Sequence, residues 1–240
     1  MNRYTFHIRA GYGDETAAIV KQMVTIGITR VAVLYQNDNF GKSGLEGVVS
    51  ALRTYQMTPA AVAPVERNSL ELAAAVDALA KVEPQAVVMV ALYKQAAEFM
   101  RRMHKTGLRP RYLALSSVGT DQLISLLGDD ARGIGLSQVM PYPWNDTVAV
   151  VREYQRLISQ GDANPSYSYI GLEAYINAKL LVEALRRVGK DPSREKLVHL
   201  LENMRHFDLG GFRVSYSPSD HSGSKFVDLT VVGDGGRVRR

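Results

Sequence analysis

Short apolar runs alternate with amphipathic stretches over the first 139 residues of the chain. Residues 31–35 and 86–92 are unbroken apolar runs, which are typical of parallel strands in a sheet covered by helices on both faces. Between such runs, apolar residues recur every three to four positions, as on one face of a helix. The pattern predicts strands at residues 4–9, 31–35, 59–65, 86–92, 112–115 and 134–139, and helices at 15–26, 42–55, 69–82, 93–106 and 121–127. Strands alternating with helices predict an α/β fold with a doubly wound parallel sheet.

The pattern changes after residue 139. The stiff segment Pro141-Tyr142-Pro143-Trp144 precedes three predicted helices, at 148–159, 167–188 and 193–204, with no strand between them. Residues 212–216 and 226–232 resemble two strands of a hairpin, and residues 233–240 a frayed tail. Two of these helices have apolar faces that need a sheet to cover them, and the hairpin is too small to do so. The faces comprise Ala174, Ala178, Leu181 and Leu185 in one helix and Leu197, Leu200 and Leu201 in the next.

Composition narrows the class of protein. The 240 residues are 46% hydrophobic and 22% charged, which suits a soluble chain of one large domain or two small ones. The net charge of +5 is not gathered into a basic stripe with aromatic residues, so nucleic acid is not an expected partner. Cysteine is absent, no apolar run reaches the length of a membrane span, and residues 1–10 lack the apolar core of a signal peptide.

No motif in the chain points to catalysis. The five histidines are not spaced like metal ligands, and no phosphate-binding or nucleophile motif follows a strand. The adjacent carboxylates Asp14-Glu15 and Asp129-Asp130 resemble helix caps or helix-end charges. We therefore expect no enzyme activity, cofactor or metal.

Three segments carry a resemblance to a known family: VAVLYQNDNFGKSGLEGV, PQAVVMVALYKQAAEFMRRMHKTGL and GGFRVSYSPSDHSGS. The chain resembles the type I periplasmic binding proteins, in particular the branched-chain amino acid receptors of ABC importers, of the leucine/isoleucine/valine-binding type. The resemblance implies two Rossmann-like lobes with the ligand in the cleft between them. By that alignment residues 1–139 form a complete C-terminal lobe, 140–146 a hinge crossing, and 147–240 the closing helices and hairpin of an incomplete first lobe.

The same resemblance implies an N-terminally truncated chain whose signal peptide lies upstream, and hence a periplasmic or extracellular location. It also implies a membrane permease as partner and a small amino-acid-like or carboxylate ligand. The apolar helix faces of the incomplete lobe would also allow a homodimer. A regulatory sensor of the same fold is the alternative function, and an enzyme with a catalytic dyad among Tyr12, Asp38, Tyr93 and Ser116 is a further one.

Candidate ligand-binding residues lie on loops expected at the carboxyl ends of strands, where open α/β sheets bind their ligands. They are Tyr12, Phe40, Tyr93, Ser116 and Ser117. Aromatic side chains would remove water from an apolar ligand, while hydroxyls would orient its polar end. For Phe40, packing at a helix start is an equal alternative. The single tryptophan, Trp144, either flanks the cleft or packs at the hinge.

Ser116 bears on the kind of ligand. By the resemblance, amino acid receptors carry at this position an acidic residue that pairs with the ligand's ammonium group. The loss of such a charge-assisted partner would cost about 2–3 kcal/mol. The sequence therefore disfavours a free α-amino acid and favours an apolar or aromatic carboxylate, or an amide.

Overall fold

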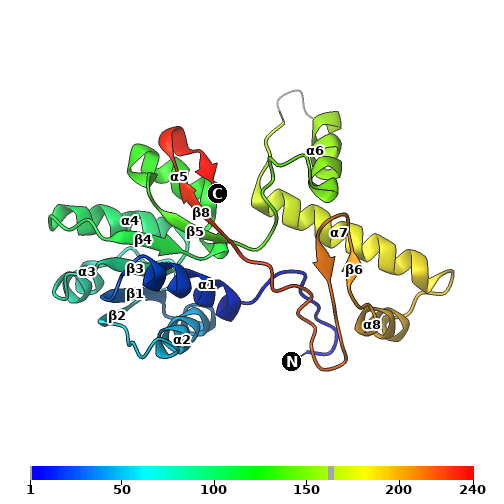
Figure 1. Ribbon diagram of the computed structural model, residues 1–240, viewed down its shortest axis with the longest axis horizontal. Coiled ribbons are helices and arrows are strands. Elements are labelled where there is room, and N and C mark those ends of the chain that lie inside the picture. The colour runs from blue at the N-terminus through cyan, green and yellow to red at the C-terminus, as the bar shows by residue number, and fades with distance from the viewer. Residues whose placement is uncertain (1, 162–164) are drawn as a thin grey trace. The chain divides into compact units, whose positions relative to one another are not determined.

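The computed structural model describes residues 2–161 and 165–240, which divide into two compact units. One unit, here called the sheet unit, comprises Tyr12–Gln138 and Val227–Arg240. The other, the helical unit, comprises the described residues of 2–11 and Val139–Phe226. The chain thus passes between the units three times, after Gly11, Gln138 and Phe226 (Figure 1).

A seven-stranded sheet in the order β2-β1-β3-β4-β5-β8-β9 forms the centre of the sheet unit. Its first five strands pair in parallel, as the apolar runs predict, and β8 and β9 are antiparallel. Every residue of β3 is buried. The strand bounds are β1 (Val31–Gln36), β2 (Ala61–Val65), β3 (Ala86–Val90), β4 (Arg111–Ala114), β5 (Gly135–Gln138), β8 (Asp228–Val232) and β9 (Val238–Arg239).

Helices cover both faces of this sheet, so the unit has two cores. Because side chains alternate along a strand, Val31 and Val33 of β1 pack in one core, and Ala32 and Leu34 in the other. The first core includes α1 (Tyr12–Thr25) and α2 (Asn39–Arg53). The second includes α3 (Ala73–Ala80), α4 (Tyr93–Lys105) and α5 (Thr120–Leu127). The 3₁₀ turns η1 (Ser116–Val118), η2 (Gly128–Ala131) and η3 (Asp234–Gly236) connect elements of the same unit.

Glycines in α2 allow that helix to lie directly on the sheet. A Cβ atom added at Gly41 would lie 1.8 Å from the carbonyl oxygen of Gln36. At Gly44 it would lie 2.4 Å from a methyl group of Val90. Asp38 caps the helix by accepting the Gly41 N–H at 3.0 Å. The first turn of α2 is therefore fixed at the carboxyl end of β1.

The helical unit contains α6 (Ala149–Gly161), α7 (Tyr169–Val188) and α8 (Arg194–Glu202), with a short hairpin of β6 (Phe207–Asp208) and β7 (Arg213–Val214). Helix α7 buries one face, which comprises Leu172, Ile176, Leu180 and Ala184. Four large apolar residues of α7 are exposed: Ile170 by 56%, Leu181 by 50%, Val182 by 46% and Leu185 by 40%. Among the described residues of this unit, no element covers these four side chains.

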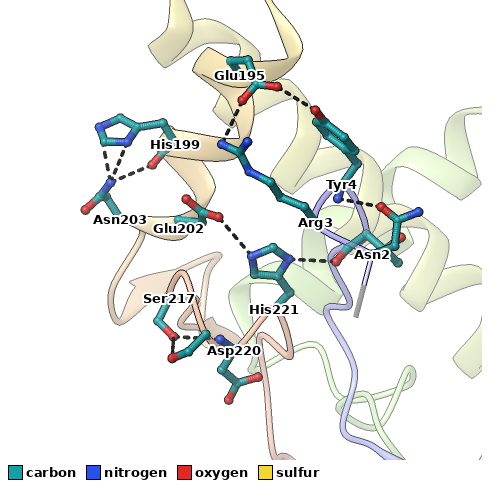
Figure 2. A network of polar contacts seen from close by, with 12 residues as sticks. Asn2, Arg3, Tyr4, Glu195, His199, Glu202, Asn203, Ser217, Asp220 and His221 are labelled. Carbon is teal, nitrogen blue, oxygen red and sulfur yellow. Dashed lines mark hydrogen bonds and ion pairs between the residues drawn. The ribbon is translucent and has the colours of Figure 1, made fainter.

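Polar contacts join the N-terminal residues to the helical unit (Figure 2). The hydroxyl of Tyr4 donates to Glu195 of α8 at 2.7 Å. The ring nitrogens of the buried His221 face the carbonyl of Thr5 at 3.1 Å and the carboxylate of Glu202 at 3.3 Å. These contacts place residues 2–11 in the helical unit.

The predicted strand at residues 4–9 is therefore wrong, and so is its place in the sheet lobe. This segment forms a single bridge, between His7 and Ser222. Its alternating pattern reflects one-sided burial: Ile8 is 3% exposed, and the ring of Phe6 stacks on that of His221 at 3.9 Å. The sheet unit begins at Tyr12 rather than residue 1.

The hairpin predicted from residues 212–216 and 226–232 is also wrong. β7 pairs with β6, whereas β8 pairs with β5 of the sheet unit, with Leu136 opposite Thr230. The tail is not frayed, because β9 pairs with β8 and buries Val238. Residues 227–240 belong to the sheet unit and extend its sheet beyond β5.

Candidate functional site

The predicted ligand-binding residues all lie in the sheet unit, and all five are half-buried. Phe40 is in the first turn of α2, after β1, and Tyr93 is the first residue of α4, after β3. Ser116 and Ser117 form η1, after β4. Tyr12 is the first residue of α1, but it follows no strand, contrary to the prediction. Four of the five residues thus follow parallel strands at the carboxyl edge of the sheet.

Tyr12 and Phe40 are in contact. Their ring centroids are 5.3 Å apart and their planes are inclined by 68°, an edge-to-face arrangement. The contact explains why each ring is only half-exposed, and it shows that Phe40 does pack at the start of its helix. Packing and ligand contact are compatible for a ring that keeps part of its surface open.

Tyr93 lies beside the loop after η1. Gly119 follows that turn with a φ of 85°, and a Cβ atom built there would lie 3.2 Å from Cδ1 of Tyr93. The left-handed backbone and this close approach both favour glycine. The loop after β4 and the start of α4 therefore form one corner of the sheet edge.

The buried carboxylate of Glu15 links α1 to the loop after β4 and to β5 at this edge. It lies in the first turn of α1 and is fully buried. Its Oε2 atom accepts the backbone N–H of Ser116 at 2.8 Å and the hydroxyl of Ser137 at 2.6 Å. Sequence reasoning treated Asp14-Glu15 as a helix-end pair and so missed this role. Ser137, near the carboxyl end of β5, is also fully buried.

Two buried polar atoms at this edge have no hydrogen-bond partner among the described residues: the Oγ of Ser117 and the Oε1 of Gln36. A buried polar atom without a partner costs about 1–3 kcal/mol, so such atoms in a native protein call for an explanation. Gln36 is the last residue of β1, and its amide nitrogen donates to Asp38 at 2.6 Å. The carboxyl edge thus carries unused hydrogen-bonding capacity.

Asp38 has a structural role at this edge. The N–H of Gly41, and then the amide of Gln36, hold the pKa of its carboxyl below the ordinary value, although burial opposes the shift. A carboxylate so engaged is a helix cap rather than a proton-transfer group. Asp38 is therefore removed from the four candidates for a catalytic dyad.

Trp144 lies in the helical unit. It packs against Tyr142, at 4.9 Å between ring centroids, and against Tyr169, at 6.1 Å. It is 40% exposed. The contacts bear out the packing interpretation for this residue.

The described residues contain no cluster of three or more side chains suited to a metal ion. Across the same part of the chain, no helix has both the length and the apolar character required to cross a membrane.

A family model described as periplasmic binding protein matches residues 1–237. The chain therefore belongs to the periplasmic binding protein family, and its fold is that of the type I, leucine/isoleucine/valine-binding group. A comparison with curated proteins gives no significant match.

Solved structures show the same relationship. A substrate-binding periplasmic protein from Ralstonia solanacearum is 35% identical with a TM-score of 0.87, over 97% of this chain and 67% of that one. A possible leucine/isoleucine/valine-binding protein from Rhodopirellula baltica is 30% identical with a TM-score of 0.90, over 100% of this chain and 67% of that one. A branched-chain amino acid ABC transporter protein from Thermus thermophilus with bound valine has a TM-score of 0.83 at 22% identity, over 99% and 66% of the two chains, and shows the fold alone. The chain thus spans about two thirds of the length of these proteins.

Proposed function

We propose that the protein is the solute-binding receptor of an ABC importer and that the carboxyl edge of the sheet unit supplies one half of its binding site. The observation that carries this proposal is a set of contacts at that edge: Tyr12 with Phe40, Glu15 with Ser116, and Tyr93 beside Gly119. Aromatic rings line it, and buried polar atoms without partners lie among them. Family membership and the similar solved structures support the same function.

The proposed ligand is a small amino-acid-like molecule or an apolar carboxylate. Half-buried Tyr and Phe rings suit an apolar side chain, and the free oxygens of Ser117 and Gln36 suit a polar head group. Sequence reasoning disfavoured a free α-amino acid because Ser116 replaces an acid. Glu15 is fully buried and its Oε2 atom already accepts two hydrogen bonds, so it does not replace that acid, and an apolar carboxylate or an amide stays favoured.

The helical unit contributes a second proposal. The exposed face of α7 borders two grooves, one of about 500 Å³ beside Val182 and Phe207 and one of about 280 Å³ beside Phe6 and Leu181. We propose that these grooves receive strands and helices of the first lobe, of which the helical unit forms a part. The similar structures are longer than this chain, which supports the proposal. The comparisons give no support to a homodimer through the same helices.

A periplasmic location and a membrane permease as partner follow from the receptor function and belong to the same proposal. Closure of a cleft around its solute would then signal the loaded state, because solute that touches both sides stabilises the closed form. A sensor of the same fold would bind its solute in the same way. Reconstitution with a permease, with solute uptake as the measurement, separates the two.

The test is thermal unfolding of the chain with three compounds that share one side chain: L-leucine, L-leucinamide and 4-methyl-2-oxopentanoate. The amide lacks the carboxylate, and the keto acid lacks the ammonium group. Benzoate and L-phenylalanine extend the series to aromatic compounds. Binding to the folded state raises the midpoint, by RT ln(1 + [L]/Kd) in free energy, and the order of the three compounds identifies which charge is recognised.

A matched pair of variants locates the site. Tyr93→Ala removes a ring from the proposed edge, and Tyr55→Ala removes a 39% exposed tyrosine that follows the C-terminal end of α2. We expect Tyr93→Ala to abolish the midpoint shift and Tyr55→Ala to retain it. A shift that survives in both variants places the solute elsewhere. The absence of any shift with the unaltered chain, repeated with the upstream region of the protein restored, contradicts the receptor function.

A further inference from the structure

Glu15 is a charged group that the proposed function does not by itself explain. A carboxylate removed from water is expensive unless strong hydrogen bonds compensate for it. Here the first turn of α1 supplies a favourable helix dipole, and Ser116 and Ser137 supply two donors to the same oxygen. The acid therefore ties three elements together at the carboxyl edge: α1, the loop after β4, and β5.

This arrangement gives the two neighbouring serines different roles. The N–H of Ser116 is bound by Glu15 and is not available to a solute. The Oγ of Ser117 is buried and has no partner among the described residues. The turn η1 then leads to Gly119, against which the ring of Tyr93 packs. The unused hydroxyl and the aromatic ring are thus part of the same corner.

We infer that Glu15 is a positioning residue that fixes the loop after β4, and that Ser117 supplies the hydroxyl through which this loop holds the polar group of the solute. The inference rests on the proposed receptor function. A serine hydroxyl both donates and accepts, so it suits a carboxylate oxygen, an amide or an ammonium group of the solute. Glu15 acts through the loop and need not touch the solute.

The first test compares Ser117→Ala with the control Ser125→Ala, at an exposed serine of α5, using L-leucine and 4-methyl-2-oxopentanoate as probes. In the absence of a probe, Ser117→Ala removes an unsatisfied buried atom, so its unfolding midpoint is expected to stay or to rise. Its affinity for the probe that binds the unaltered chain is expected to fall about tenfold, as for the loss of one hydrogen bond. Ser125→Ala is expected to keep its affinity within about twofold, because that hydroxyl is exposed on α5 and takes no part in the proposed corner.

Affinity unchanged in Ser117→Ala contradicts the inference. So does a clear drop in its midpoint without a probe, because that would show that the hydroxyl already has a structural partner.

The second test concerns Glu15 and needs no solute. Glu15→Gln keeps an oxygen able to accept both donors, whereas Glu15→Ala removes it. We expect hydrogen exchange at the Ser116 amide to be at least about tenfold faster in Glu15→Ala and close to normal in Glu15→Gln, because only the alanine variant loses the acceptor. Exchange in β1, away from the contact, serves as the internal control.

Equal exchange in the alanine variant and the unaltered chain overturns the positioning role, and so does a glutamine variant as fast as alanine. Should Glu15→Ala fail to fold, Ser137→Ala removes one of the two donors and leaves the acid in place. Exchange at Ser116 is then expected to stay slow, with the acid still bound to that amide. If no compound of the series binds, even with the upstream region restored, the receptor function fails, while the exchange experiment still decides the role of Glu15.

Discussion

The sheet unit and the helical unit both contain helices with apolar faces but differ in what covers those faces. In the sheet unit, helices lie on both faces of the sheet, and β3 is entirely buried. In the helical unit, α7 buries one face and exposes Ile170, Leu181, Val182 and Leu185 on the other. The five predicted site residues all lie in the unit that has the complete sheet. A binding site at the carboxyl edge of a sheet requires a sheet of several parallel strands. The described part of the helical unit contains only the two-stranded hairpin of β6 and β7.

Truncation of a core side chain in the two units should show the largest difference. Leu34 in β1 is fully buried, and Leu34→Ala is expected to lower the free energy of unfolding by about 2–5 kcal/mol, because it leaves a cavity. Leu181→Ala on the 50% exposed face of α7 is expected to change it by less than about 0.5 kcal/mol. Urea unfolding followed by circular dichroism measures both. Similar losses would mean that the α7 face is covered after all.

Two helix glycines, one in each unit, test how closely their helices pack against neighbouring residues. Gly41→Ala places a Cβ atom 1.8 Å from a backbone oxygen of Gln36, which cannot move aside, and should cost about 1–3 kcal/mol. Gly171→Ala in α7 meets the hydroxyl of Tyr154 at 2.4 Å, which is the end of a side chain rather than backbone. Its cost should be smaller because a ring is displaced more easily than the backbone, whereas the gain of about 1 kcal/mol from alanine in a helix applies to both sites. Melting temperatures of the two variants are the measurement, and a larger loss at Gly171 would contradict the close fit of α2.

Asp38 in the sheet unit and Asp208 in the helical unit both accept backbone N–H groups. The N–H of Gly41 lowers the pKa of Asp38, and those of Gly211 and then Gly210 lower the pKa of Asp208. Since each folded-state pKa lies below that of the unfolded chain, the stabilisation is complete above about pH 4 and is lost as pH falls through the lowered pKa.

Asp38→Ala should cost about 0.5–2 kcal/mol at pH 7, as for other helix caps, and that cost should disappear at low pH. Asp208→Ala should cost less, because its side chain is 48% exposed and screened by solvent. Stability curves from pH 2 to pH 7 test both expectations. A cost that grows toward low pH would reverse the sign and refute the capping role.

The smallest expected effect concerns the exposed apolar face itself. Val182→Gln on α7 should leave the free energy of unfolding within about 0.5 kcal/mol and should reduce binding of an apolar fluorescent dye, because Val182 borders the 500 Å³ groove. Val62→Gln on the edge strand β2, where the valine is 40% exposed, should leave dye binding unchanged. If the two variants bound equal amounts of dye, the groove beside Val182 would not be a binding surface for apolar molecules.

The apolar runs predicted most of the sheet unit because strands that are buried on both faces, such as β1 and β3, have continuous apolar sequences. Residues 2–11 and 227–240 were misassigned because their partners lie far away in the sequence. For instance, β8 pairs with β5 about ninety residues earlier, and no local period encodes that choice. Proline at position 64 fits its strand because β2 lies at the edge of the sheet.

The candidate site shows the same limit. Phe40, Tyr93, Ser116 and Ser117 were found from their position after strands, and their role in binding stays a prediction. Glu15 could not be recognised from its neighbours, because an acid in the first turn of a helix is ordinary. Only the fold brings the N–H of Ser116 and the hydroxyl of Ser137, more than a hundred residues away, to one of its oxygens.

Hydrogen exchange along the whole chain, with and without the compound that most raises the unfolding midpoint among L-leucine, L-leucinamide and 4-methyl-2-oxopentanoate, tests the central claim most directly. Without a compound, β1 and β3 should exchange most slowly, and α7 should open at a lower free energy. On addition, protection should increase in the first turns of α1 and α4 and in η1. New protection confined to α7 and the hairpin, with the carboxyl edge of the sheet unit unchanged, would contradict the account.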